Sequence, residues 1–325
     1  MLNEAVRSTA KRLAVIIVSA NSGHWLRPCL RTVFEHAGDI ELDVVVVDSG
    51  CTDDTVALVQ REFPRARTLS CINRGFAHAN NQALRGVDSE WILFLNPDTE
   101  ILDGSLADLV ARADARIDIG LVGVRQVTQE GQLFPTIRRF PSVARAWFEA
   151  LGSERLPIRA PWLGERELDL DRYNDEVECD WTSGSFMLAR RDALLGAGFF
   201  DERFFLYAEE TDLCLRIKRA GWRVLHMPYL TVLHHVRTNS WEPRLHAQAV
   251  FARRQYLEKH FPPMRRGAAL GALIVAQGIR ALLPGVAERR ASSLAALKTL
   301  IGLEPPPFGR PPPVALVRDE SVDSG

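Results

Sequence analysis

The sequence lacks the features that stabilise small secreted proteins or mark membrane spans. Its five cysteines are scattered, their number is odd and no two are spaced C-x-x-C. This argues against a disulfide framework and a structural zinc site, and it favours a reducing compartment. The longest apolar stretch, residues 267–279, falls short of the ~20 residues that span a bilayer. We therefore expect a cytoplasmic protein whose membrane contact, if any, is peripheral and on the inner face of the plasma membrane.

Charge of either sign is not in excess. The chain has 40 Lys and Arg against 41 Asp and Glu, a formal net charge of −1. Dedicated nucleic-acid binders usually carry a clear basic excess, so no nucleic-acid partner is expected. Hydrophobic residues make up 46% of 325 residues, enough for a full core without disulfides or metal.

Short apolar runs alternate with helical patterns over the first 120 residues. The runs are rich in β-branched residues and predict strands buried on both faces, as in a parallel sheet covered by helices. The last of the intervening helices is predicted over residues 102–115. The pattern indicates an α/β fold with a doubly wound, mostly parallel central sheet. The predicted strands are residues 13–18, 43–47, 68–71 and 91–95.

Polar side chains follow three of these strands. Asn21, Asp48 and Asp98 lie at the carboxyl ends, where ligands of doubly wound sheets bind. A carboxylate there can hold Mg²⁺ or Mn²⁺, which bridges phosphate oxygens. Structural alternatives stay open, because Thr52 or Asp53 can be a helix cap and Asn96-Pro97-Asp98 is also typical of a turn.

The second half of the chain predicts a mixed arrangement. Residues 150–178 are charged and irregular, which favours a mobile loop. Short strands are predicted over residues 222–225 and 231–233, and a helix over residues 243–260. His234 and His235 follow the second of these strands, and a histidine pair there is as much a candidate ligand as a structural feature.

Three carboxylates, Glu209, Glu210 and Asp212, open another predicted helix. They suit the positive end of the helix dipole, which is a structural explanation. Adjacent carboxylates also raise one another's pKa, and such a cluster can supply a general base.

In this order, the segments resemble the family 2 glycosyltransferases, which are inverting enzymes of the GT-A fold, and within them the rhamnosyltransferase-like branch. The resemblance runs from about residue 13 to residue 240. The segments that carry it are LAVIIVSANS, VVVVDSGCTDDT, NRGFAHANNQAL, WILFLNPDTEIL, TSGSFMLARRDALLGAGFFDERFFLYAEETDLCLRIKRAGWRV and VLHHVRTNS.

The resemblance implies roles for residues of a donor site. Asn21 and Asp48 would bind the nucleotide base and ribose. Ser49-Gly50-Cys51 departs from the family's usual Asn-Gly-Ser, which leaves the details of nucleotide contact open. Further donor-binding positions are Asn73, Gly75, Asn80 and Asn96.

It also implies a metal site. Asp98 stands where the family places its metal-binding carboxylate, and His234 would complete a site for Mg²⁺ or Mn²⁺. The usual D-x-D pattern is Asn96-Pro97-Asp98 in this chain, so one carboxylate is missing.

A catalytic base and an acceptor side follow from the same resemblance. Glu210 stands at the position of the family's presumed base, usually Asp, and whether Glu210 or Glu209 takes the proton stays open. Of the acceptor-side positions, Asp212 is the one that we expect to have a structural role. Those positions are Ser183, Gly184 and Asp212.

The resemblance divides the chain into a nucleotide-sugar-binding half, residues 12–120, and an acceptor and catalytic half, residues 121–240. A flexible N-terminus, residues 1–11, precedes them, and a helical extension, residues 241–303, and a proline-rich flexible tail, residues 304–325, follow. Within the extension, residues 264–285 combine basic and apolar side chains, which suits an interfacial helix on anionic lipid. An ordinary packing helix is the alternative.

The implied function is metal-dependent, inverting sugar transfer in the synthesis of a cell-surface polysaccharide. The donor would be a dTDP-deoxysugar, best dTDP-rhamnose, and the acceptor a saccharide or a polyprenyl-linked saccharide. The departures at Asn96 and Glu210 leave room for an inactive nucleotide-sugar-binding or scaffold protein. A nicotinamide-dependent oxidoreductase would need G-x-G-x-x-G after the first strand, where this chain reads SANSG.

Overall fold

The computed structural model describes residues 12–152, 163–235, 242–283 and 287–309. Three sequence predictions fall wholly or partly outside the described residues. They are the flexible N-terminus, part of the irregular loop (153–162) and most of the proline-rich tail (310–325).

Four parallel strands form the first half of the sheet, in the order β3-β2-β1-β4. The central residues of β1, β2 and β4 are apolar and buried on both faces, as the sequence predicts. Strand β3 lies at the edge of the sheet, and its central residues are only partly buried, contrary to the prediction. Helices α1, α2 and α3 connect them. The bounds are β1 (Arg12–Ser19), α1 (Gly23–Glu35), β2 (Glu41–Ser49), α2 (Thr55–Glu62), β3 (Ala66–Cys71), α3 (Phe76–Leu84) and β4 (Trp91–Leu95).

The second half of the sheet is mixed. A strand antiparallel to β4 continues the order as β8-β6-β9-β5, and β7 pairs with β9 beside this path. Within the described residues, all nine strands belong to one sheet. The bounds are β5 (Thr99–Gly104), β6 (Ile119–Val127), β7 (Val177–Glu178), β8 (Phe186–Arg190) and β9 (Arg223–His234).

Two local predictions were wrong. The helix predicted over residues 102–115 starts only at α4 (Leu106–Asp114), because Thr99–Gly104 pairs with β9 as strand β5. The strands predicted over 222–225 and 231–233 are one strand, β9, whose pairing with β6 shifts register in the middle. Short apolar segments do not distinguish helix from strand by periodicity alone, and both errors arise where pairing with a distant strand decides.

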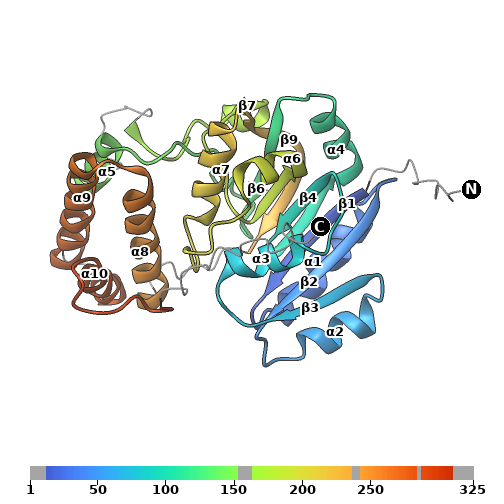
Figure 1. The fold of residues 1–325 in the computed structure, drawn as a ribbon, viewed down its shortest axis with the longest axis horizontal. Coiled ribbons are helices and arrows are strands. Elements are labelled where there is room, and N and C mark those ends of the chain that lie inside the picture. Colours follow the sequence, from blue (N-terminus) through green and yellow to red (C-terminus); the bar gives the residue numbers. More distant parts are fainter. Residues whose placement is uncertain (1–11, 153–162, 236–241, 284–286, 310–325) are drawn as a thin grey trace, which may run out of the picture.

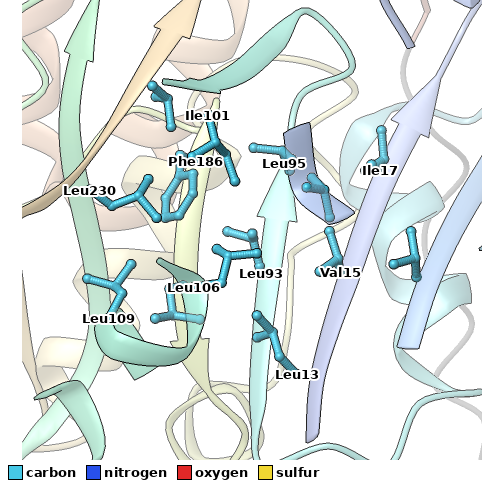
Figure 2. Close-up of a cluster of buried hydrophobic side chains, with 14 of the residues drawn as sticks. Leu13, Val15, Ile17, Leu93, Leu95, Ile101, Leu106, Leu109, Phe186 and Leu230 are labelled. Atoms are coloured by element: carbon cyan, nitrogen blue, oxygen red, sulfur yellow. The ribbon is translucent and has the colours of Figure 1, made fainter. Parts of the chain in front are cut away.

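Helices cover both faces of the sheet, and each face has its own hydrophobic core. Leu13 and Val15 of β1 pack with α1, α2 and α4, and Figure 2 shows this core extending to Leu230 of β9. Ala14 and Ile16 face the opposite way and pack with α3, α6 and α7. Of these helices, the two not yet defined are α6 (Arg191–Ala197) and α7 (Glu209–Arg219).

Four further helices pack together on one side of the molecule (Figure 1). The small residues Ala269, Ala272 and Ala276 of α9 are buried there against α5 and α8. Part of the apolar stretch predicted to contact a membrane therefore packs inside the protein. No helix in the described ranges is long and apolar enough to cross a bilayer. The four are α5 (Val143–Ala150), α8 (Pro243–His260), α9 (Pro263–Leu282) and α10 (Ala287–Leu300).

Candidate active site

Asn21 ties the loop after β1 to the loop after β2. Its Oδ1 accepts hydrogen bonds from the backbone N–H groups of Thr52 (2.7 Å) and Asp53 (3.3 Å). Asn21 has a φ of +58°, a conformation in which asparagine is enriched. Asp53 accepts hydrogen bonds from Gly23 and Thr55, so it joins α1 to the start of α2. These contacts fix the shape of the rim at the carboxyl ends of β1 and β2.

Asp48 is a half-buried carboxylate at the end of β2. It accepts hydrogen bonds from the Cys51 backbone N–H (2.7 Å) and the Ser70 hydroxyl (3.0 Å). Burial alone would raise the pKa of Asp48, but these hydrogen bonds outweigh it and lower the pKa below its usual range. Asp48 is therefore ionised at neutral pH and can accept further hydrogen bonds.

The loop between β3 and α3 approaches the segment that precedes α7. Asn73 Oδ1 accepts a hydrogen bond from the Gly75 backbone N–H (3.2 Å), and Phe76 N–H donates to the Phe205 carbonyl (2.7 Å). Gly75 has a φ of +102°, and any side chain there would overlap the backbone of Phe205. Asn80 has no exposed surface and donates to the Phe76 carbonyl, so its contact to a donor would have to be indirect.

Asp98 and His234 meet where β5 begins and β9 ends. His234 Nε2 lies 3.6 Å from Asp98 Oδ1, beyond hydrogen-bond distance. His235 points elsewhere: its Nε2 donates to Glu100 (2.6 Å) and its ring lies 4.3 Å from that of Trp25. Of the two histidines, His234 is the one placed beside Asp98.

The Asp98–His234 pair fits a divalent cation in part. Asp98 Oδ1 is buried and has no hydrogen-bond partner, so it holds unused ligand capacity, and the His234 nitrogen that faces it is Nε2. A carboxylate oxygen suits Mg²⁺ or Mn²⁺. In the described part of the chain no three His, Cys, Asp or Glu side chains form a metal cluster, so a substrate phosphate and water would complete the ligand set.

Glu209 and Glu210 are held at the start of α7 by strained backbone. Tyr207 (φ +70°) and Ala208 (φ +63°) precede them, and such conformations cost about 1–3 kcal/mol each and cluster at functional sites. Burial and the charge of Glu210 raise the pKa of Glu209 well above its usual range. Burial also raises the pKa of Glu210, whereas the nearby Arg138 favours its ionised form.

Asp212 points away from this pair, into the protein. It has no exposed surface and contacts Arg216 (2.7 Å), Lys259 (2.6 Å) and His260 (2.7 Å). Burial opposes ionisation, but these partners together lower the pKa of Asp212 from 3.8 to about 2. The contacts join α7 to the end of α8 and leave Asp212 no surface for an acceptor.

The acceptor-side residues come close to Glu210 through the turn before β8. A side chain at Gly184 would lie 3.7–3.9 Å from the side chain of Glu210. Ser183 Oγ lies 3.0 Å from Ser185 Oγ, and the Ser185 carbonyl accepts a hydrogen bond from the Asn96 backbone N–H. The turn thus links the end of β4 to the carboxylate pair.

A cavity of about 730 Å³ opens beside Glu210, between the sheet and the C-terminal helices. Arg138 and Trp181 are part of its wall, with the guanidinium of Arg138 5.4 Å from the Trp181 ring centre. Sequence reasoning missed both residues, because no motif marks them and only the fold brings them to Glu210.

Comparison with known proteins identifies the group to which this site belongs. The sequence model described as glycosyl transferase family 2 matches residues 14–194. The chain belongs to glycosyltransferase family 2. This assignment confirms the predicted family and enzyme class, and it replaces the oxidoreductase alternative.

Two similar proteins of known name are rhamnosyltransferases. An N-acetylglucosaminyl-diphospho-decaprenol L-rhamnosyltransferase of Mycobacterium tuberculosis is 30% identical over 251 residues, 73% of this chain and 80% of that protein. The rhamnosyltransferase WbbL of Escherichia coli is 26% identical over 238 residues, 68% of this chain and 82% of that protein.

The fold is also found in solved glycosyltransferase structures. A mannosyltransferase from Pyrobaculum calidifontis, in complex with GDP-Man and Mn²⁺, matches with a TM-score of 0.54 at 19% identity. The match covers 92% of this chain and 83% of that one. The predicted α/β fold of the GT-A type is thereby confirmed.

Proposed function

We propose that this glycosyltransferase is an inverting rhamnosyltransferase. Its donor is a dTDP-deoxysugar, dTDP-rhamnose in the first place, and its acceptor is a saccharide or a polyprenyl-linked saccharide. The rhamnosyltransferase relatives support this choice of sugar. The observation that carries the mechanism is the buried carboxylate pair of Glu209 and Glu210, with Glu210 in the wall of a cavity that can hold an acceptor.

Glu210 is the catalytic base of this proposal. Two adjacent buried carboxyls do not both ionise readily, and Arg138 favours the charge on Glu210. Glu209 then keeps its proton, because its pKa is raised well above the usual range. Ionised Glu210 takes the proton of an acceptor hydroxyl as that oxygen attacks the anomeric carbon. One displacement inverts the anomeric configuration and needs no covalent nucleophile.

Asp98 and His234 are the residues that would hold Mg²⁺ or Mn²⁺. When bound, the ion supplies positive charge to the leaving diphosphate. The fit rests on the unpartnered, buried Asp98 Oδ1 and on His234 Nε2, which lies 3.6 Å from it. The Mn²⁺ in a solved structure of the same fold is consistent with it.

The donor's nucleoside lies, in this proposal, at the ends of β1 and β2. Asp48 is ionised and accepts hydrogen bonds from the ribose, whereas Asn21 shapes the rim that faces the base. In this proposal Asn73, Gly75 and Asn96 lie beside the donor, and the buried Asn80 contributes only indirectly. Residues 12–120 form the donor half and residues 121–240 the acceptor half. The protein works on the cytoplasmic side of the plasma membrane.

A thermal-shift experiment with nucleotide sugars, with and without Mn²⁺, tests the proposal. A ligand at 100 times its Kd stabilises the folded state by about 2.7 kcal/mol. We expect a metal-dependent rise in Tm with dTDP-rhamnose, followed by turnover with that donor. A protein that binds the donor but never transfers its sugar would be the scaffold considered from the sequence.

A further inference from the structure

The cavity beside Glu210 has a net positive lining. Arginines outnumber carboxylates in its wall, and burial lowers the pKa of the lining His246, which keeps it neutral. The lining arginines are Arg138, Arg166, Arg253, Arg280 and Arg289, and the lining carboxylates are Glu149, Glu165 and Glu210.

Two of the carboxylates already neutralise arginines in the wall. Arg253 of α8 pairs with Glu165, and Arg280 of α9 pairs with Glu149 (3.1 Å). The side chains of both arginines are about one-fifth exposed, at 20% and 21%. The surplus of guanidinium groups therefore gives the cavity a charge suited to an anion, and guanidinium is the side chain that matches phosphate geometry.

The mouth of the same cavity is apolar. Leu151, Ile279 and Leu283 line the cavity and are also 65%, 37% and 47% exposed, so they lie where it opens to solvent. Leu282 beside them is 84% exposed. A cavity with cationic walls and exposed leucines at its mouth matches an amphiphile with an anionic head and an apolar chain.

We propose that this cavity binds the diphosphate that links the acceptor sugar to a lipid chain. Arg289 of α10 holds the diphosphate, and Arg253 and Arg280 add guanidinium N–H donors beyond those paired with Glu165 and Glu149. The exposed apolar side chains at the mouth contact the lipid chain. The inference rests on the proposed function, because the acceptor hydroxyl must reach Glu210 from this cavity. It assigns the helical extension a role in selecting the class of acceptor.

Geranyl diphosphate provides a test that needs no turnover. Its Kd is measured by isothermal titration calorimetry in EDTA, so that no metal-bound diphosphate forms at the donor site. Arg289→Glu is compared with Arg290→Glu, which makes the same charge change on the exposed neighbouring residue. We expect Arg289→Glu to raise the Kd about tenfold or more, since charge-assisted hydrogen bonds are lost, and Arg290→Glu to leave it unchanged.

Equal Kd values for Arg289→Glu and Arg290→Glu would overturn the proposal. If Arg289→Glu does not fold, as judged by circular dichroism, Arg280→Gln replaces it with the same expectation. Vesicles of phosphatidylglycerol separate the diphosphate from lipid headgroups. The proposal is also wrong if Arg289→Glu weakens vesicle binding but not geranyl diphosphate binding.

Donor binding separates this inference from the proposed function. The Mn²⁺-dependent Tm shift with dTDP-rhamnose should be the same in Arg289→Glu and in the unchanged protein. Its absence in both would contradict the proposed donor site and leave the diphosphate result standing by itself.

Discussion

Replacing Glu210 by Gln separates catalysis from stability in this site. The amide has the same shape but cannot take a proton, and a positioned general base contributes about 100- to 10,000-fold to a rate. We therefore expect kcat of Glu210→Gln to fall by that factor, or about 2.7–5.4 kcal/mol in the activation barrier. Donor affinity should stay the same, because the nucleoside lies elsewhere in this account.

Glu210→Gln should lower kcat but raise the stability of the folded protein at pH 7. The pKa of Glu210 is raised in the folded protein, so its ionisation disfavours folding as pH rises above the usual carboxyl range, and the cost is absent in acid. Removing the charge should raise Tm at pH 7, by about 2–4 °C per kcal/mol, and have little effect at pH 4. For the same reason, the transfer rate of the unchanged protein should rise with pH with an apparent pKa above the usual value of 4.5.

Transfer kinetics and thermal melts of Glu210→Gln and Glu209→Gln give the comparison. Glu209 is protonated in this account, so Glu209→Gln should keep transfer within about tenfold and also raise Tm. The reasoning would be refuted if Glu210→Gln retained near-normal kcat, or if Glu209→Gln lost as much activity.

Three other changes test parts of the structure. Asp98→Asn should abolish the Mn²⁺-dependent part of donor affinity in thermal-shift titrations, and an unchanged metal dependence would contradict the metal site. Asp212→Asn should lower the free energy of unfolding, measured in urea at pH 7, by about 2–3 kcal/mol, because the pKa of Asp212 is about 2 in the folded protein and 3.8 in the unfolded one. This loss should vanish as the pH falls from about 4 to 2, and a loss that did not depend on pH would argue against the ion cluster. Gly75→Ala should lower the free energy of unfolding by about 1–3 kcal/mol or more. Gly131→Ala, also at positive φ but in open space, should lower it less. Equal Tm values for the two variants would show that the close approach of Gly75 to Phe205 does not matter for stability.

The sequence predicted the parallel half of the sheet well, because β1, β2 and β4 contain continuous apolar runs followed by polar residues. It also proposed Asp98 and His234 together, and the structure places them 3.6 Å apart although 136 positions separate them in the chain. That proposal came from the family resemblance and not from local pattern. Of the two histidines, His235 contacts Glu100 and Trp25, and the choice of His234 as the metal ligand stays a prediction.

Contacts between distant elements were beyond sequence reasoning. The helix predicted over residues 102–115 begins too early, because residues 102–104 belong to a strand that forms only by pairing with β9. Arg138 came to Glu210, and Lys259 to Asp212, through packing that no local motif records. The cavity beside Glu210 also forms only through such packing, since its lining comes from both halves of the chain.

The most direct test is transfer itself, from dTDP-rhamnose to an N-acetylglucosaminyl diphosphate lipid, with Mn²⁺ or with EDTA. The product's anomeric configuration is read by NMR. The account predicts transfer that needs the metal and inverts the configuration at the anomeric carbon. Retained configuration, or no transfer from any nucleotide sugar by protein that binds one, would contradict it.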